Sequence, residues 1–138
     1  MARFAAAVPM RWTDQDSYRH LNHARAVTLL EEARIALVFD AATAEGVPGL
    51  AAGLLVTGLE VRYRRQIAYR SSPLRVTMGV DRVRAASFRI TYEMHDGADE
   101  ADPVAISAHT DMATFDLAAQ RPRRLLSQER AFLERWSG

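Results

Sequence analysis

The sharpest change of chemistry along this sequence falls between two adjoining segments, RWTDQDSYRHLNH at residues 11–23 and ARAVTLLEEARIALVF at residues 24–39. The first carries two carboxylates, two imidazoles and two carboxamides, and the second is rich in Ala and Leu, which predicts a helix. A helix N-terminus offers unpaired N–H groups and a partial positive charge, which suit a developing oxyanion. Acids and imidazoles beside it are groups that transfer protons. This junction is therefore the first candidate for chemistry.

The elements around the junction follow from the sequence pattern. We expect a strand over residues 3–12, a polar loop over 13–22 and a helix over 23–44, which EGVPG at residues 45–49 ends. Large apolar residues lie on one side of this helix and alanines on the other sides. Because the helix is apolar nearly all round, we expect it to be buried nearly all round. These apolar residues are Val27, Leu30, Ile35, Leu37 and Val38.

The remainder of the chain is predicted to be mostly strand. Apolar and polar residues alternate around residues 55–64, 76–80, 88–94 and 104–114, with Leu55, Leu59, Val61 and Tyr63 expected on one face of the first strand. A turn is expected at 96–103, and a short amphipathic helix over 127–136 with Ser127 as its N-cap. One helix followed by long antiparallel strands predicts an α+β domain in which a sheet wraps around that helix. The length of 138 residues suits a single domain, 1–138.

Composition excludes several classes of protein. All 18 basic residues are Arg, so a Schiff-base lysine and a phosphate-loop ATPase are excluded, although codon bias is the simpler cause of this usage. Cysteine is absent, which excludes a thiolate nucleophile and a Cys-ligated metal. The net charge of +1 gives no sign of a nucleic-acid partner, and no apolar run is long enough to span a membrane. The apolar run at the N-terminus is too short to resemble a signal peptide closely, so we expect a cytoplasmic protein. We also expect that the protein needs no cofactor and no metal.

Several motifs together resemble a known family. WTDQD, then HLN after three residues, and LEEAR in the helix are similar to the hotdog-fold acyl-CoA thioesterases of the 4-hydroxybenzoyl-CoA thioesterase type. The likeness continues through VRYRR (61–65), VAISA (104–108) and the closing RPRRL (121–125). It implies a hotdog fold, in which an antiparallel sheet of five or six strands wraps around one long buried helix, and an acyl-CoA substrate. An open sheet edge would further favour a homodimer or homotetramer.

The resemblance also implies two site roles. Asp16 matches the catalytic carboxylate, and the backbone N–H near His23 matches the group that polarises the thioester carbonyl. From position alone we add His20, which would hold the loop or Asp16, and Asn22, which would orient water or the carbonyl. The sequence departs from the family pattern at Arg19, where Gly is usual, at His23, where a second Asn is usual, and at Ala26, where Tyr is common.

Substrate-binding candidates lie at the end of the first long predicted strand. We expect Tyr63, Arg64 and Arg65 to contact substrate, and Arg62 or Arg70 could join them in binding CoA phosphates. A solvated outer strand face is an equally good interpretation of these arginines.

Other interpretations of the polar residues stay open. Asp14 is expected to cap a turn, and Asp16 could do the same. A metal site built from Asp14, Asp16, His20 and His23 is disfavoured by the loose spacing. His95 and His109 are treated as structural. Two alternatives to a thioesterase are a non-catalytic acyl-CoA binding protein and, more weakly, a hotdog dehydratase, whose usual His-containing helix motif is absent.

Overall fold

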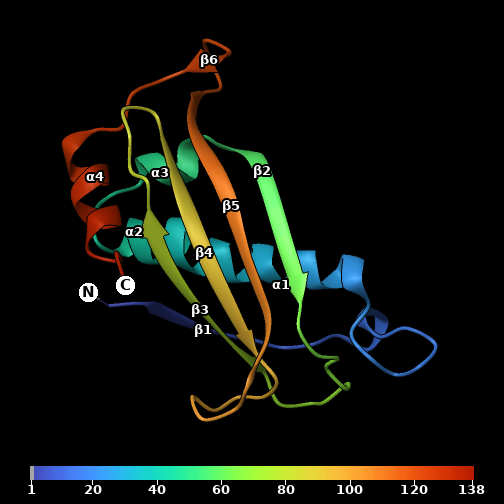
Figure 1. Cartoon of the computed structure of the whole chain (residues 1–138). Coiled ribbons are helices and arrows are strands. Elements are labelled where there is room, and N and C mark those ends of the chain that lie inside the picture. Colours follow the sequence, from blue (N-terminus) through green and yellow to red (C-terminus); the bar gives the residue numbers. More distant parts are fainter. Residues whose placement is uncertain (1) are drawn as a thin grey trace.

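A computed structural model describes residues 2–138 (Figure 1). The helices and strands, in chain order, are β1 (Phe4–Val8), α1 (His23–Ile35), α2 (Ala42–Ala44), α3 (Gly49–Ala52), β2 (Leu54–Tyr63), β3 (Leu74–Asp81), β4 (Ser87–His95), β5 (Val104–Asp116), β6 (Arg121–Pro122) and α4 (Ser127–Glu134). Within these residues no helix is both long and apolar enough to cross a membrane.

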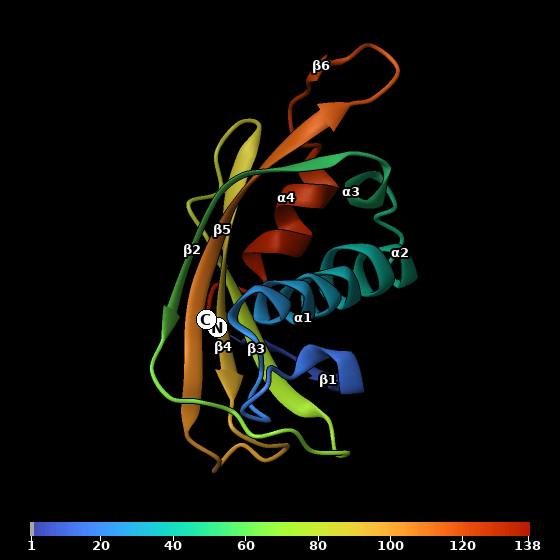
Figure 2. The same cartoon turned by 90° about the vertical axis from the view of Figure 1, so that its right-hand side faces the viewer.

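The strands form one antiparallel sheet in the order β1-β3-β4-β5-β2, with the short β6 paired to β5. Figure 2 shows that the sheet curls and that α1 lies along its concave side. Alternate residues of the central strands fill the space between sheet and helix, as their period-two pattern predicts. These buried residues include Val76, Met78, Val80, Phe88, Ile90, Tyr92 and Met94. The predicted sheet wrapped around a long helix, the hotdog arrangement, is confirmed.

The long helix begins at His23 and runs without a break to Ala44, close to the predicted bounds. Its middle, Ala36–Ala41, is a π-helical segment that periodicity did not predict. The side facing the sheet is buried, and includes Leu29, Leu30 and Leu37. The opposite side carries the exposed Glu31 and Glu32, so the expectation of burial nearly all round is wrong: alanines fit either side of a helix.

The predicted alternation of residues 55–63 is wrong at its start, because β2 contains a β-bulge. The pairing of β2 with β5 shifts between Val56 and Gly58, so that Val56 lies opposite Met112 and Leu59 opposite Thr110. An extra residue in a strand moves everything before it to the other face. Leu55 therefore lies on the face opposite to Leu59, and not on the same face as predicted.

The C-terminal helix is capped differently from the prediction. Its N-cap is Leu126, not Ser127, and the Leu126 N–H donates to Oε1 of Glu129 at 2.7 Å. Glu129 is fully buried and also pairs with both terminal nitrogens of Arg123, each at 2.8 Å. Burial alone would raise the pKa of Glu129, but these hydrogen bonds hold it below its ordinary value. A carboxylate at the third helical position replaces the hydroxyl cap that Ser127 would have supplied.

Candidate active site

The polar loop folds back on itself before the helix begins. The Asp16 N–H donates to the His20 carbonyl at 2.8 Å, and the Arg19 N–H donates to the Asp16 carbonyl at 3.1 Å. Arg19 adopts a left-handed conformation with φ 63°, which is uncommon outside glycine. This is the position where the resemblance leads one to expect Gly.

The loop is also fastened to the segment after β2. The Leu21 N–H donates to the Ile67 carbonyl at 2.7 Å, and the Tyr69 N–H donates to the Arg19 carbonyl at 3.1 Å. These bonds join segments that lie far apart in the chain, which no local pattern predicts. They place the polar loop, the start of α1 and the end of β2 around one cavity.

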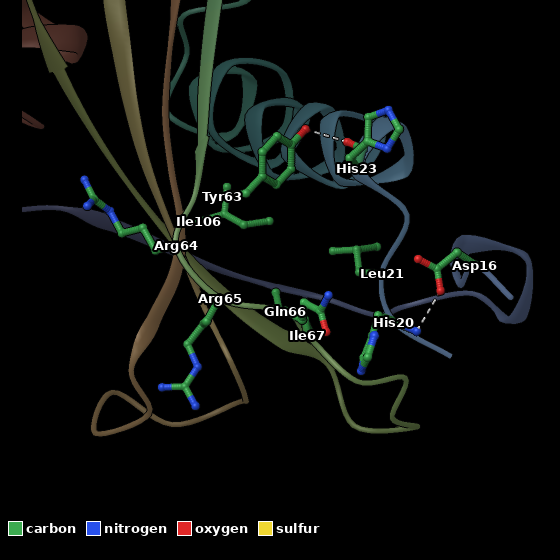
Figure 3. Close-up of a pocket in the computed structure, with 10 residues that line it drawn as sticks. All are labelled: Asp16, His20, Leu21, His23, Tyr63, Arg64, Arg65, Gln66, Ile67 and Ile106. Carbon is green, nitrogen blue, oxygen red and sulfur yellow. Dashed lines mark hydrogen bonds between the residues drawn. The ribbon is translucent and has the colours of Figure 1, made fainter. Parts of the chain in front are cut away.

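That cavity has a volume of about 390 Å³ (Figure 3). It brings together six of the seven predicted site residues, Asp16, His20, His23, Tyr63, Arg64 and Arg65. The other lining residues, which were not predicted as site residues, are Leu21, Gln66, Ile67 and Ile106. Gln66 and Ile67 directly follow the predicted arginines, and their position in the sequence was the one clue to them.

Asp16 is held by backbone groups of its own loop. Its Oδ1 accepts the Tyr18 N–H at 2.8 Å and the His20 N–H at 3.2 Å. Within residues 2–138, Oδ2 has no hydrogen-bond partner. One oxygen therefore fixes the carboxylate, and the other stays free to meet water or substrate in the cavity.

The N-terminus of α1 leaves one donor free in the residue that lines the same cavity, His23. Asn22 is the N-cap, and its Oδ1 accepts the N–H groups of Ala24 at 2.8 Å and Arg25 at 3.4 Å. No acceptor within the described chain lies against the N–H of His23, which is the first helical residue and lines the cavity. Asn22 itself lies outside the cavity lining and serves the helix start, rather than taking the water-orienting position that we expected.

Tyr63 fixes the peptide at the start of the helix. Its hydroxyl donates to the His23 carbonyl at 2.7 Å, and the two rings meet edge to face with centroids 6.4 Å apart. Figure 3 shows this hydrogen bond between the Tyr63 hydroxyl and the start of α1, while the Arg64 and Arg65 side chains point away from it. Desolvation raises the pKa of Tyr63, so the hydroxyl keeps the proton that it donates.

His20 holds Asp16, as expected, but does so through its backbone. Its backbone N–H, not its imidazole, contacts Asp16. The Nδ1 of its ring is buried and has no hydrogen-bond partner in the described chain, and the residue lines the cavity. The His20 ring therefore forms part of the cavity wall.

Asp14 lies apart from the cavity and is fully buried. It accepts hydrogen bonds from the Arg11 backbone N–H at 2.7 Å and from the Arg11 Nη2 at 2.8 Å. Burial alone would raise the pKa of Asp14, but the bonds from Arg11 hold it below its ordinary value. Within residues 2–138, no three His, Asp or Glu side chains gather as metal ligands would.

The predicted phosphate-binding arginines differ in how far their charge is neutralised. Arg62 pairs with Glu60 at 3.1 Å, and Arg65 pairs with Asp96 at 3.3 Å. Arg70 also pairs with Asp96. Arg64 donates to the uncharged Ser107 hydroxyl at 2.8 Å and has no carboxylate partner among the described residues. Only Arg64 and Arg65 of this group line the cavity.

Comparison with known proteins gives the family. Residues 10–132 match the family described as the Thioesterase-like superfamily, and the chain belongs to it. No curated protein matches the chain significantly.

Solved structures share the fold. A predicted thioesterase from Bacillus stearothermophilus is similar with a TM-score of 0.82 at 19% identity, over 99% of this chain and 98% of that one. A thioesterase from Thermus thermophilus, complexed with coenzyme A and Zn, has a TM-score of 0.76 at 21% identity, over 97% and 94%. A 1,4-dihydroxy-2-naphthoyl-CoA thioesterase from Synechocystis has a TM-score of 0.76 at 14% identity, over 96% of each chain.

Proposed function

We propose that this protein is an acyl-CoA thioesterase of the 4-hydroxybenzoyl-CoA thioesterase type, which hydrolyses an acyl-CoA thioester to a free acid and CoA. One observation carries the proposal: the same cavity is lined by Asp16, whose Oδ2 is free, and by His23, whose N–H has no acceptor among the described residues. A carboxylate beside an oxyanion donor is the equipment that acyl transfer to water needs.

The mechanism assigns one step to each group. Asp16 either takes a proton from the attacking water or attacks the thioester carbonyl itself. The carbonyl oxygen gains the negative charge and accepts the His23 N–H at the positive end of the α1 dipole. The intermediate then collapses, the C–S bond breaks, and CoA leaves as a thiolate, which takes up a proton. When water attacks, the free acid forms directly and Asp16 gives its proton back; when Asp16 attacks, an Asp16–acyl anhydride remains, and water hydrolyses it to the free acid and the Asp16 carboxylate. A general base contributes roughly 10²–10⁴ in rate and one oxyanion donor roughly 10²–10³.

The other residues support this geometry. Tyr63 and Asn22 hold the start of the helix from its carbonyl and N–H sides, so that the His23 N–H keeps its direction. The backbone N–H of His20 keeps Asp16 in place, and the His20 ring closes the wall. The thioester is already activated, so no cofactor is needed in the proposal.

Thiol release from a panel of acyl-CoAs tests the proposed function against the alternatives. We expect free CoA to appear with at least one acyl-CoA. A non-catalytic binding protein would show a rise in melting temperature with acyl-CoA and no free thiol. A dehydratase would act on 3-hydroxyacyl or enoyl substrates and leave the thioester intact. Either of these results would contradict the proposal.

Arg64 is the arginine expected to matter most for CoA binding. Arg64 contributes to the cavity lining, and its guanidinium, which lies against Ser107, has no carboxylate partner among the described residues, so Arg64→Ala should raise KM for acyl-CoA about tenfold, the scale of one charge-assisted hydrogen bond. The KM for the same acyl group on pantetheine, which lacks the nucleotide phosphates, should change far less. Arg62→Ala is the matched control because Arg62 is paired with Glu60 and lies outside the cavity lining. Equal losses on both substrates would make Arg64 structural.

We also propose that the protein forms at least a homodimer through β2. This strand lies at the end of the sheet and pairs only with β5 in the described chain. It exposes Leu55 by 41%, Val56 by 47%, Leu59 by 47% and Tyr63 by 49%. Long apolar edge strands are normally paired or covered, and β1 at the other edge is short and mostly Ala. Light scattering at micromolar concentration should give at least twice the chain mass of 15.4 kDa, and the monomer mass would contradict this prediction.

A further inference from the structure

A second hollow lies between α1 and β2 and is not used by the proposed chemistry. This seam hollow has a volume of about 330 Å³ and is lined by apolar and hydroxyl side chains, Val27, Thr28, Val56, Leu59 and Thr110. Glu31 and Arg34 complete the lining and pair with each other at 3.4 Å. Because neither charge is left without a partner, the seam hollow suits an apolar occupant.

The seam hollow and the catalytic cavity lie at two levels of the same pair of strands. Tyr63 and Ile106 line the catalytic cavity and lie opposite each other on β2 and β5. Leu59 and Thr110 line the seam hollow and are likewise opposite each other. All four side chains belong to one face of the sheet, and the two levels are four residues apart, so they are separated by roughly 13 Å along the strands.

Small side chains occupy the strands between these two levels. Val61 and Ala108 form the intermediate pair, and neither lines the catalytic cavity or the seam hollow. On α1 one turn separates His23, at the catalytic cavity, from Val27, at the seam hollow. Since these intermediate side chains are small, the passage between the two spaces is bounded by a larger side chain at the edge of the catalytic cavity.

That larger side chain is Tyr63, which crosses from β2 to α1. Its hydroxyl donates to the His23 carbonyl at 2.7 Å, and its ring meets the His23 ring edge to face. Figure 3 shows the Tyr63 side chain reaching from the end of β2 to the start of α1. Because Tyr63 is about half exposed, this bond to α1, more than packing in the core, fixes where the ring lies.

We infer that Tyr63 limits the size of the acyl group that the protein accepts, because its ring closes the passage from the catalytic cavity to the seam hollow. The acyl group is then confined to the space beside Leu21, Ile67 and Ile106, which suits a short or compact acyl group. This inference rests on the proposed thioesterase function, since it concerns the acyl half of the same substrate. It makes Tyr63 a specificity-determining residue.

The wild-type protein provides the first test. An extended chain advances roughly 1.2 Å per bond, so a decanoyl chain reaches about 11 Å past the thioester carbon and a butanoyl chain about 4 Å. Wild type should therefore hydrolyse butanoyl-CoA with a higher kcat/KM than decanoyl-CoA, both used below the concentration at which micelles form. An equal or higher kcat/KM for decanoyl-CoA would overturn the inference.

Removing the ring should open the passage. In Tyr63→Ala the ratio of kcat/KM for decanoyl-CoA to that for butanoyl-CoA should rise at least tenfold, since each newly buried methylene is worth about fourfold in binding. The ratio cancels any loss of chemistry that both substrates share. Tyr63→Phe keeps the ring, loses the bond to His23 and preserves most of the packing, so its ratio should rise by a smaller factor. A ratio that stays at the wild-type value in both variants would overturn the inference.

Filling the seam hollow gives the matched control. Val27→Phe places a larger side chain in the hollow, at a position outside the catalytic cavity. Alone it should leave the ratio at the wild-type value, because the passage is already closed. Combined with Tyr63→Ala it should cancel the gain for decanoyl-CoA. A double variant that keeps the full gain would show that the longer chain takes another path, which overturns the inference.

A binding measurement separates this inference from the proposed function. In an Asp16→Asn background, which spares the substrate, decanoyl-CoA should raise the melting temperature more when Tyr63 is replaced by Ala than when it is present. If this holds while wild type releases no thiol from any acyl-CoA, the thioesterase proposal fails and the size limit stands. If thiol is released but neither the ratio nor the melting temperature depends on Tyr63, the size limit alone fails.

Discussion

Asp16→Asn should lower kcat for acyl-CoA hydrolysis by roughly 10²-fold or more, the scale expected for losing a general base or carboxylate nucleophile. The amide oxygen of Asn can still accept the N–H groups of Tyr18 and His20, so the loop should keep its shape. The other group becomes an NH₂, which neither removes a proton nor attacks a carbonyl. Acyl-CoA affinity and melting temperature should stay close to wild type.

The matched control for this change is Asp40→Asn. Asp40 is an exposed carboxylate on the π-helical segment and lies outside the lining of the candidate active site. Asp40→Asn should leave kcat for acyl-CoA hydrolysis unchanged. If Asp16→Asn turned over substrate within a few-fold of wild type while Asp14→Asn abolished turnover without unfolding, the roles of the two carboxylates would be reversed.

Asp14→Asn should lower the stability of the folded protein. The substitution removes the charge of the fully buried Asp14, but Arg11 is half exposed and stays solvated, so the loss is that of a hydrogen bond to a charged group, about 1.5 kcal/mol in the free energy of unfolding. Urea unfolding followed by circular dichroism measures it. At a temperature where the variant is folded, its kcat should stay within a few-fold of wild type. A stability unchanged within about 0.5 kcal/mol, the size of ordinary surface substitutions, would contradict the role assigned to the pair.

The stability of the protein should fall in acid because of two buried carboxylates, Asp14 and Glu129. Both pKa values lie below their ordinary values in the folded protein, so the unfolded chain binds protons more readily. Their contribution is fully present above the unfolded pKa of about 4 and is lost as the pH falls through the lower folded values. Asp14→Asn should therefore flatten the fall of stability below about pH 4. An unchanged acid slope would contradict the assignment.

Local signals were sufficient to predict the fold. The change from polar residues to apolar ones placed the helix start at His23, and period-two alternation marked the buried faces of β3 and β4. What local signals missed depends on geometry between distant segments. The bulge near Thr57, which turns Leu55 to the other face, arises from the pairing of β2 with β5. The cap of α4 depends on Arg123 meeting Glu129 in the interior.

The site was predictable in its residue types and less so in its contacts. The motif indicated Asp16 and the helix start, yet the sequence could not tell that the His20 N–H holds Asp16 or that the Tyr63 hydroxyl reaches the His23 carbonyl. The contact of Tyr69 with Trp12 could not be predicted either, because it forms only after the loop bonds to the segment behind β2. Asn22 was predicted as a catalytic residue that orients water or the carbonyl, whereas its capping role follows from the direction of its side chain, which the sequence does not give.

The most direct test of the account is the fate of an acyl-CoA given to the wild-type protein in isotopically labelled water. We predict that one free thiol appears for each free acid, that the acid carries oxygen from the water, and that Asp16→Asn nearly abolishes the release of both products. Acyl-CoA that binds and raises the melting temperature while no thiol and no labelled acid appear would contradict it.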